Sequence, residues 1–516
     1  VSILADGARR ELEVDPWVRR VTLRVPPTGL DEQLPDWHNV QRALGAQAGA
    51  LQPLLRALRQ LPGALRAQEG LITLLVADAP GGTYVIRVDP GAGPERLLGI
   101  AFDIGTTTVV GYLMDLETGA QLAVSSLLNP QTRYGDDVVS RIEYATTQPQ
   151  GLETLQREIV GAMNTIIHNA ALAALVSAHD ILALTAVGNT TMQHLFLGIS
   201  PSALAQAPYV PAFSQGVCIR AHELCLAIYP DAIVCALPSI AGWVGADTVG
   251  VILSTGVHRQ PEIALAIDIG TNGEMALGSA RRLITCSTAA GPAFEGAHLS
   301  CGMRAADGAV DAVQIDAQVH WHAIGEAAPR GVCGSGLVDT VAELLRNGIL
   351  DATGMMLDSQ VLHDNGRCHL AERITSEGRR RQFRLVDEAQ GAGGRAIAIT
   401  QRDVRELQLA KGAIRAGIEI LMKELGIGPE DVAYVYLAGA FGNYIKPESA
   451  LGIGLMPRFP NATLVPVGNA AGSGAKMALL SRAARQEADA IVGRVEYLEL
   501  SGRADFQGEF AEAMVF

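Results

Sequence analysis

Two copies of one short motif constrain the fold of this 516-residue chain most strongly. Each copy is an apolar, β-branched run that ends in Asp followed by Ile-Gly-Thr, at residues 100–108 and 264–274. The run predicts a buried strand, and its glycine lets the backbone turn so that N–H and hydroxyl groups can face a phosphate. Asp103 and Asp268 end the strands, where a carboxylate can act on a metal ion or a water. We therefore expect a duplicated domain that holds a nucleotide in the cleft between its halves.

Composition limits the classes of protein that fit. A chain of this length is too long for one hydrophobic core, so we expect about two to four units. The formal net charge of -14 and the lack of a long basic run argue against a nucleic-acid partner. No window has about 18 uninterrupted apolar residues, so no membrane span is expected. The seven cysteines are unevenly spaced and do not resemble a disulfide framework, which favours a reduced, cytoplasmic location.

Composition and periodicity divide the chain into four expected parts. Residues 1–15 are expected to form a linker arm and residues 16–95 a small α+β middle domain. The large domain follows, with its first half at 96–258 and its second half at 259–516.

Within the small domain, the pattern predicts a strand over 17–24, helical spacing over 36–61 and a hairpin with strands at 71–76 and 83–88. The two halves of the large domain share one predicted plan of three strands followed by helix, strand and helix. In the first half the strands are predicted at 99–103, 108–114, 120–127 and 181–187, and the main helices at 137–147 and 152–175. In the second half the strands are predicted at 263–268, 274–278, 281–286 and 432–437, and the helices at 335–347 and 403–425.

This plan resembles the superfamily that contains acetate and sugar kinases, Hsp70 chaperones and actin. Its five landmark segments occur here in the superfamily's order: phosphate-one at 103–108, a first connecting segment at 187–191, phosphate-two at 268–273, an adenosine segment at 437–442 and a second connecting segment at 469–475. The resemblance implies an α/β, actin-like ATPase fold with duplicated ribonuclease H-like halves, preceded by the small α+β middle domain.

The strings between these landmarks are similar to those of a narrower family, the ATP-dependent reductive activators of corrinoid proteins. They include Tyr-Gly-Asp-Asp-Val-Val-Ser-Arg-Ile at 134–142, Gly-Val-Cys-Gly-Ser-Gly-Leu-Val-Asp at 331–339, and the segments 187–192, 401–414 and 467–471. The resemblance implies that ATP hydrolysis with Mg²⁺ drives the reduction of Co(II) to Co(I) in a corrinoid protein of a methyl-transfer system. It also implies a separate electron donor and a homodimer.

The family's N-terminal ferredoxin module is expected to be missing from this chain. A plant-type [2Fe–2S] cluster needs four closely spaced thiolates, whereas Cys218 is the first cysteine here. The arm at 1–15 is similar to the family's linker, which favours removal of the module before Val1 over a homologue that never had it. The [2Fe–2S] cluster is therefore expected only in a full-length form.

Residue types then suggest roles in the nucleotide cleft. Asp103 and Asp268 are expected to hold the waters of Mg²⁺, and Asp247 to orient the attacking water, with a helix-capping role for Asp247 left open. The remaining phosphate contacts are expected from three short segments, with ordinary turn chemistry as the alternative for the threonines. These residues are Gly105, Thr106, Thr107 and Thr108, then Asn189 and Thr190, and then Gly270, Thr271, Asn272 and Gly273.

Three further sets of residues complete the predicted site. Gly439, Ala440 and Gly442 would let the adenine lie against the backbone. Gln408, Lys411 and Arg415 follow one another by one helical turn and can reach one ligand, or they form a solvated polar face. Gly334, Ser335 and Gly336 open a helix whose N-terminus attracts anions, or they allow that helix to pack closely.

Other functions remain open at this point. Cys286, Cys301 and Cys333 could hold an iron–sulfur cluster, as in the activators of 2-hydroxyacyl-CoA dehydratases, but they lack a local ligand pair and structural roles are favoured. A small-molecule kinase of the same superfamily would need a base aimed at a substrate hydroxyl, and no such base is identifiable. A binding module that only switches with ATP is the third class.

Overall fold

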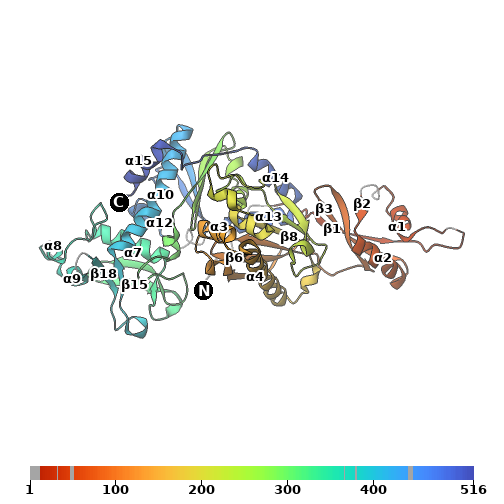
Figure 1. Ribbon diagram of the computed structural model, residues 1–516, viewed down its shortest axis with the longest axis horizontal. Coiled ribbons are helices and arrows are strands. Elements are labelled where there is room, and N and C mark those ends of the chain that lie inside the picture. The colour runs from red at the N-terminus through yellow and green to blue at the C-terminus, as the bar shows by residue number, and fades with distance from the viewer. Residues whose placement is uncertain (1–11, 32, 47–50, 365–366, 378–379, 440–444) are drawn as a thin grey trace. The chain divides into compact units, whose positions relative to one another are not determined.

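The computed structural model describes residues 12–31, 33–46, 51–364, 367–377, 380–439 and 445–516 (Figure 1). These residues form two compact units. The N-terminal unit comprises the described residues up to Leu253 together with Ala471–Gly493, and the C-terminal unit comprises Ser254–Ala470 and Arg494–Phe516. Within the described ranges, the chain therefore passes from one unit to the other after Leu253, after Ala470 and after Gly493.

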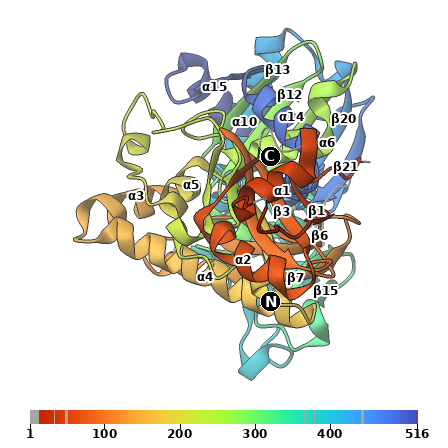
Figure 2. The ribbon, with the colours of Figure 1, turned by 90° about the vertical axis from the view of Figure 1, so that its right-hand side faces the viewer.

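A small α+β region opens the N-terminal unit (Figure 2). Its sheet has the order β1-β3-β4-β2, with β3 antiparallel to both β1 and β4, and with β2 parallel to β4. The elements are β1 (Val18–Arg24), α1 (Asp36–Leu44), β2 (Leu51–Pro53), α2 (Leu55–Ala67), β3 (Leu71–Ala79) and β4 (Gly82–Pro90). Leu61, Ile72 and Leu74 are buried in a hydrophobic cluster that belongs to this region alone. The predicted strand and hairpin are confirmed.

The helical spacing predicted over 36–61 belongs to two separate helices, α1 and the first part of α2. α1 ends at Leu44, because Gly45 has a φ of 59° that an L-residue rarely adopts. The chain then forms the short strand β2, and α2 begins only at Leu55. The periodicity missed this break because Leu and Ala recur at similar spacing on both helices.

The main sheet of the N-terminal unit has six strands in the order β7-β6-β5-β8-β10-β9. β5 is antiparallel to β6 and parallel to β8, and β8 is parallel to β10. The strands are β5 (Leu98–Ile104), β6 (Thr108–Asp115), β7 (Gln121–Leu128), β8 (Ile181–Gly188), β9 (Val217–Arg220) and β10 (Ile233–Ala236). The helices of this unit are α3 (Val138–Thr147), α4 (Gly151–Ala173), α5 (Thr190–Leu197), α6 (Ala246–Thr255), α13 (Ala470–Leu480) and α14 (Arg482–Val492).

The C-terminal unit repeats this topology. Its main sheet has the order β21-β20-β11-β12-β13-β22, with β11 antiparallel to β12 and parallel to β20. The strands are β11 (Ile263–Ile269), β12 (Gly273–Gly278), β13 (Leu283–Thr288), β20 (Val432–Ala438), β21 (Thr463–Gly468) and β22 (Val495–Tyr497). In the first sheet β7, β6, β5, β8 and β10 lie side by side in this order, and in the second sheet β13, β12, β11, β20 and β21 take the same places. The predicted duplication and the actin-like fold class are therefore confirmed.

Two small sheets and several helices complete the C-terminal unit. The small sheets are formed by β14 (Ala309–Ile315), β15 (Val319–Ala323) and β16 (Gly331–Val332), and by β17 (Ile374–Glu377), β18 (Arg380–Val386) and β19 (Ile397–Thr400). The helices are α7 (Gly334–Arg346), α8 (Ser359–Asp364), α9 (Cys368–Ala371), α10 (Gln401–Leu425), α12 (Pro447–Gly452) and α15 (Ala504–Ala513). One large hydrophobic cluster joins the main sheet, both small sheets, α7 and α10.

Helix α10 forms where the sequence predicts it. Thr400 accepts the N–H of Asp403, and the Asp403 carboxylate accepts the N–H of Thr400, so the helix start is capped reciprocally. Gly426 ends the helix in the left-handed conformation. The predicted apolar stripe is buried, from Val404 to Leu421. No helix in the described ranges, α10 included, is long and apolar enough to cross a membrane.

One pair of cysteines departs from the sequence-based expectation. β9 and β10 pair with Cys218 opposite Cys235, and the two residues form a disulfide. The uneven spacing of the cysteines, which does not resemble a disulfide framework, therefore did not predict this one pair. The sequence did not show the pairing because β9 and β10 are short strands that the periodicity did not predict.

Candidate nucleotide-binding site

The phosphate-one turn connects β5 to β6 in the N-terminal unit. The N–H of Gly105 donates to the carbonyl of Thr108 at 3.0 Å, which closes the turn. A Cβ at position 105 would lie 2.6 Å from that same carbonyl oxygen, so only glycine fits. Asp103 lies one strand position before Ile104, between Val110 of β6 and Val187 of β8. The predicted carboxylate is therefore at the carboxyl end of the central strands.

The first connecting segment meets this turn. Asn189 accepts the N–H of Met192 and so caps α5, while its amide nitrogen donates to the hydroxyl of Thr106 at 2.9 Å. A Cβ at Gly245 would lie 2.5 Å from the Cα of Asn189, so the chain just before α6 packs directly against the cap. Thr190 instead donates its hydroxyl to the carbonyl of Ala241 at 2.7 Å. The structure thus brings Thr106, Asn189 and the start of α6 together.

Asp247 lies in the first turn of α6, two residues after Gly245. Its carboxylate accepts the N–H of the next residue, Thr248, at 2.7 Å. Asp247 is the second residue of the helix, so this bond is not the N-cap interaction that the sequence left open. Burial raises the pKa of Asp247 to about 6, which outweighs the effect of its hydrogen bonds. A carboxylate with this pKa is mostly ionised at neutral pH and still accepts a proton readily.

The phosphate-two turn occupies the equivalent place in the C-terminal unit. The N–H of Gly270 donates to the carbonyl of Asn272 at 3.0 Å, and the hydroxyl of Thr271 donates to a carboxylate oxygen of Glu295 at 2.5 Å. Gly273 packs against α10, because a Cβ there would lie 2.8 Å from the side chain of Ile414. Glu295 was not predicted, since nothing in the local sequence marks a residue that reaches this turn from a later loop.

The adenosine segment begins next to Asp268. Asp268 pairs with Ala438 in the parallel register of β11 and β20, and Gly439 follows with a φ of 88°. A Cβ at Gly439 would lie 2.7 Å from the Asp268 carboxylate, so the backbone approaches that group closely. The structure therefore places Asp268 and Gly439 together. The predicted residues Ala440 and Gly442 lie outside the described part of the chain.

Gln408 and Lys411 are buried and contact the C-terminal residues of the chain. The amide nitrogen of Gln408 donates to the carbonyl of Met514 at 2.8 Å and to that of Thr353 at 3.0 Å. Lys411 donates to the carbonyl of Val515 at 2.5 Å. The interpretation of these two residues as a solvated polar face is wrong, because each has a relative exposure of 1%.

Burial also changes the chemistry of Lys411. The pKa of its ammonium is lowered to about 8, first by burial and then by the charge of Arg415. The ring of Phe516 lies 4.9 Å from the ammonium, and no carboxylate pairs with Lys411 among the described residues. Arg415 itself pairs with Glu419 on the next turn. The three residues therefore do not converge on one position.

Close packing accounts for the glycines at the start of α7. A Cβ at Gly334 would lie 1.8 Å from the carbonyl oxygen of Phe294, and one at Gly336 would lie 2.1 Å from that of Val310. Ser335 is buried, and its hydroxyl lies 3.3 Å from the Cys333 sulfur. Of the two interpretations of this segment, the structure favours packing.

The remaining cysteines give no support to a metal cluster. Cys286 and Cys333 are buried, and burial raises the pKa of the Cys286 thiol well above its usual range. Cys301 is partly buried. Within the described ranges, no three His, Cys, Asp or Glu side chains come close enough to hold a metal ion.

Models of three regions match almost the whole chain: the RACo linker region at residues 7–93, the RACo middle region at 98–260, and the C-terminal domain of RACo, the ASKHA domain, at 262–516. The chain belongs to the RACo family. In the terms of these models, the small α+β region lies within the linker region.

Individual RACo relatives are similar over most of their length. The corrinoid activation enzyme RamQ of Eubacterium limosum is 38% identical over 423 residues, which cover 81% of this chain and 70% of RamQ. The [Co(II) methylated amine-specific corrinoid protein] reductase of Methanosarcina barkeri is 30% identical over 72% of this chain and 68% of its own. A solved structure, a reductive activator for corrinoid, iron-sulfur protein, superposes with a TM-score of 0.88 at 36% identity, over 99% of this chain and 81% of that one.

The second connecting segment of this RACo chain lies at a close helix crossing in the N-terminal unit. A Cβ at Gly474 of α13 would lie 2.3 Å from the Cα of Gly250 of α6, so the two backbones touch. Beside the crossing, the hydroxyl of Ser254 donates to the carbonyl of Ala470 at 2.8 Å. Two of the passages between the units, after Leu253 and after Ala470, are therefore held next to each other.

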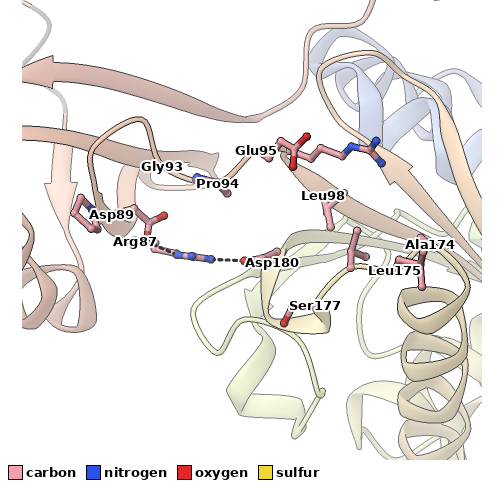
Figure 3. A pocket seen from close by; sticks show the side chains of 13 residues that line it. Arg87, Asp89, Gly93, Pro94, Glu95, Leu98, Ala174, Leu175, Ser177 and Asp180 are labelled. Carbon is pink, nitrogen blue, oxygen red and sulfur yellow. Dashed lines mark hydrogen bonds and ion pairs between the residues drawn. The ribbon is translucent and has the colours of Figure 1, made fainter.

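A cavity of about 770 Å³ lies in another part of the N-terminal unit (Figure 3). It is formed by β4, the connection from β4 to β5 and the end of α4. Arg87 projects across it from β4 and binds Asp180 at 2.9 Å, and Asp89 binds the same guanidinium. None of the predicted site residues lines this cavity.

Proposed function

We propose that this RACo chain is an ATPase that reductively activates a corrinoid protein. The observation that carries the proposal is its membership of the family at 38% identity to a corrinoid activation enzyme across most of both chains. The phosphate-one and phosphate-two turns support the proposal, because each follows the first strand of its sheet and the two sheets have the same topology. A sugar or acid kinase of this fold is not favoured by any contact of the described residues.

The proposed chemistry begins with the two aspartates. Mg²⁺ takes oxygen ligands and keeps most of its waters, so carboxylates can hold it through those waters without a cage of protein ligands. Asp103 and Asp268 would hold those waters. When bound, Mg²⁺ neutralises charge on the phosphates. Thr106, Thr271 and the amides of both turns would hold the phosphate oxygens.

Asp247 would act on the attacking water. Its carboxylate lies on the element that packs against Asn189, and Asn189 in turn binds Thr106 of the phosphate-one turn. With a pKa of about 6 it can accept the proton of the water as the new P–O bond forms. The bond from the γ-phosphorus to the oxygen that bridges to the β-phosphate breaks at the same time, so the products are ADP and inorganic phosphate.

The free energy of hydrolysis would support an electron transfer that is otherwise unfavourable. We propose that one electron from a separate donor reduces Co(II) in the partner to Co(I), while ATP binding and hydrolysis change the conformation of the chain and the surroundings of the corrinoid. The family resemblance adds a cytoplasmic homodimer. A longer form of the protein would carry the [2Fe–2S] cluster.

The first prediction tests this function directly. A corrinoid protein poised as Co(II) is expected to stimulate phosphate release by the chain, and Co(I) is expected to accumulate in its absorption spectrum when ATP and an electron donor are present. Asp103→Ala and Asp268→Ala should each reduce the stimulated rate by about 100-fold or more, because each removes part of the charge that organises Mg²⁺. Arg402→Ala, at a position where the side chain is largely exposed, serves as the control. Phosphorylation of a metabolite without any response to a corrinoid protein would contradict the proposal.

A further inference from the structure

The segment from Asn129 to Arg141 lies beneath the phosphate-one turn and has no role in the chemistry described so far. It includes most of the Tyr-Gly-Asp-Asp string and runs from the end of β7 into the first turn of α3. Three of its polar side chains, those of Asn129, Gln131 and Arg141, have no exposed surface at all. So many buried polar groups in one short segment need specific partners.

Their partners include the backbone of the phosphate-one turn. Asn129 donates its side-chain N–H to the carbonyl of Gly105 at 2.9 Å and its backbone N–H to the carbonyl of Thr107 at 2.9 Å. Arg141 donates to the carbonyl between them, that of Thr106, at 2.6 Å. Three consecutive carbonyls of the turn are therefore held by this one segment.

This arrangement fixes the direction of the amide groups in the turn. In a trans peptide the carbonyl and the N–H point to opposite sides. With the carbonyls of Gly105 and Thr106 directed at Asn129 and Arg141, the N–H groups of Thr106 and Thr107 are directed away from the segment. These are the amides that a phosphate bound at the turn would meet.

The charge of Arg141 has an additional effect. A guanidinium that donates to a carbonyl polarises the whole peptide group and makes the N–H of the next residue a stronger donor. Arg141 is also held at its other nitrogens, by the carbonyl of Gly135 at 2.9 Å and the sulfur of Met192 at 3.3 Å.

We propose that Arg141 is a positioning residue for phosphate binding: it holds the phosphate-one turn with the amides of Thr106 and Thr107 directed at the phosphate, and its positive charge strengthens them as donors. The proposal rests on the proposed binding of ATP. It does not require Arg141 to touch the nucleotide.

The second prediction compares two substitutions of Arg141. Arg141→Gln keeps a hydrogen-bond donor but removes the charge, and it should weaken the binding of a non-hydrolysable ATP analogue about tenfold and raise KM similarly, with kcat changed less than about threefold. Arg141→Lys keeps the charge and should stay within about threefold of the wild-type affinity. The measurements are titration calorimetry with Mg²⁺ and the analogue, steady-state ATP hydrolysis, and the thermal midpoint of each variant.

Arg485→Met provides the matched control. Arg485 is a partly buried arginine of the same unit that stacks on Trp17, with its guanidinium 5.0 Å from the ring, and it donates to the carbonyl of Asp78 rather than to the turn. This variant should lose stability but bind the analogue like the wild type. Equal affinity of Arg141→Gln and Arg485→Met would overturn the inference. Should Arg141→Gln fail to fold, Arg141→Lys decides, because a tenfold loss there is incompatible with a role for the charge. A wild-type chain that binds no ATP would instead overturn the proposed function.

Discussion

At the scale of single residues, burial is the main cause of the shifted pKa values of Asp247 and Lys411. Asp247 and Lys411 both have a pKa displaced toward neutrality, the first upward to about 6 and the second downward to about 8, and desolvation is the largest cause for both. Exposed groups such as Asp316 instead have a pKa set mainly by hydrogen bonds. Sequence alone cannot make this distinction, because it shows the residue type and not the burial.

The third prediction concerns Asp247 and pH. If Asp247 accepts the proton of the attacking water, the rate of ATP hydrolysis should fall as the pH drops below about 6, in proportion to the ionised fraction of the carboxylate. Asp247→Asn should lower kcat by about 100-fold or more and abolish this acidic limb. The check is a pH–rate profile between pH 5 and pH 8 for both proteins under saturating ATP. An unchanged limb in the variant would assign the proton to another group.

The fourth prediction concerns Lys411 and stability. Because its pKa is lowered in the folded state, the unfolded chain binds more protons between about pH 8 and the ordinary lysine value of 10.5, so stability should rise with pH across that window. Lys411→Met removes the titrating group and should flatten this part of the stability profile, while also losing the bond to Val515. Urea unfolding at pH 7.5 and at pH 10 measures the difference. Lys423→Met, whose lysine pairs with Glu509 on the surface, is the control that should retain the rise.

At the scale of elements, α10 shows what periodicity can predict and where it stops. The spacing of apolar residues from Val404 to Leu421 predicted the helix and its buried face correctly, because residues on one face of a helix recur with the period of the helix. The partners of Gln408 and Lys411 are the residues near Phe516, which are distant in sequence and show no matching pattern. α15 packs along α10 and brings those residues to it (Figure 1).

Partners distant in sequence also could not be predicted for the phosphate-one and phosphate-two turns. Their position after buried strands was predictable from the local sequence, because a strand that ends in Asp-Ile-Gly-Thr carries its own turn signal. Glu295 and Arg141 reach the turns from loops and helices further along the chain, so only the fold reveals them. The break between α1 and α2 was missed for a related reason, since β2 is a strand of only three residues inside a helical pattern.

At the scale of the whole molecule, two of the three points where the chain leaves one unit for the other lie next to each other, after Leu253 and after Ala470. The N-terminal unit consists of two chain segments. α6 lies at the end of the first segment and α13 at the start of the second, and these helices touch at Gly250 and Gly474. A close crossing of two glycines leaves no room for a side chain, so a larger residue at either position must shift one helix against the other.

The fifth prediction tests this crossing with Gly474→Ala. The added Cβ would lie 2.3 Å from the backbone of Gly250, so the helices must separate, at a cost of about 1–3 kcal/mol in the free energy of unfolding. Because α6 also carries Asp247, the shift should reduce ATP turnover more than nucleotide affinity. Gly161→Ala on α4 is the matched control, since nothing lies within 4 Å of the new Cβ and the change should stabilise the helix by about 0.5–1 kcal/mol. Chemical denaturation and single-turnover hydrolysis measure the two effects. Equal stability and turnover of the two variants would show that the helices can separate freely and that the crossing does not link the connections to the site.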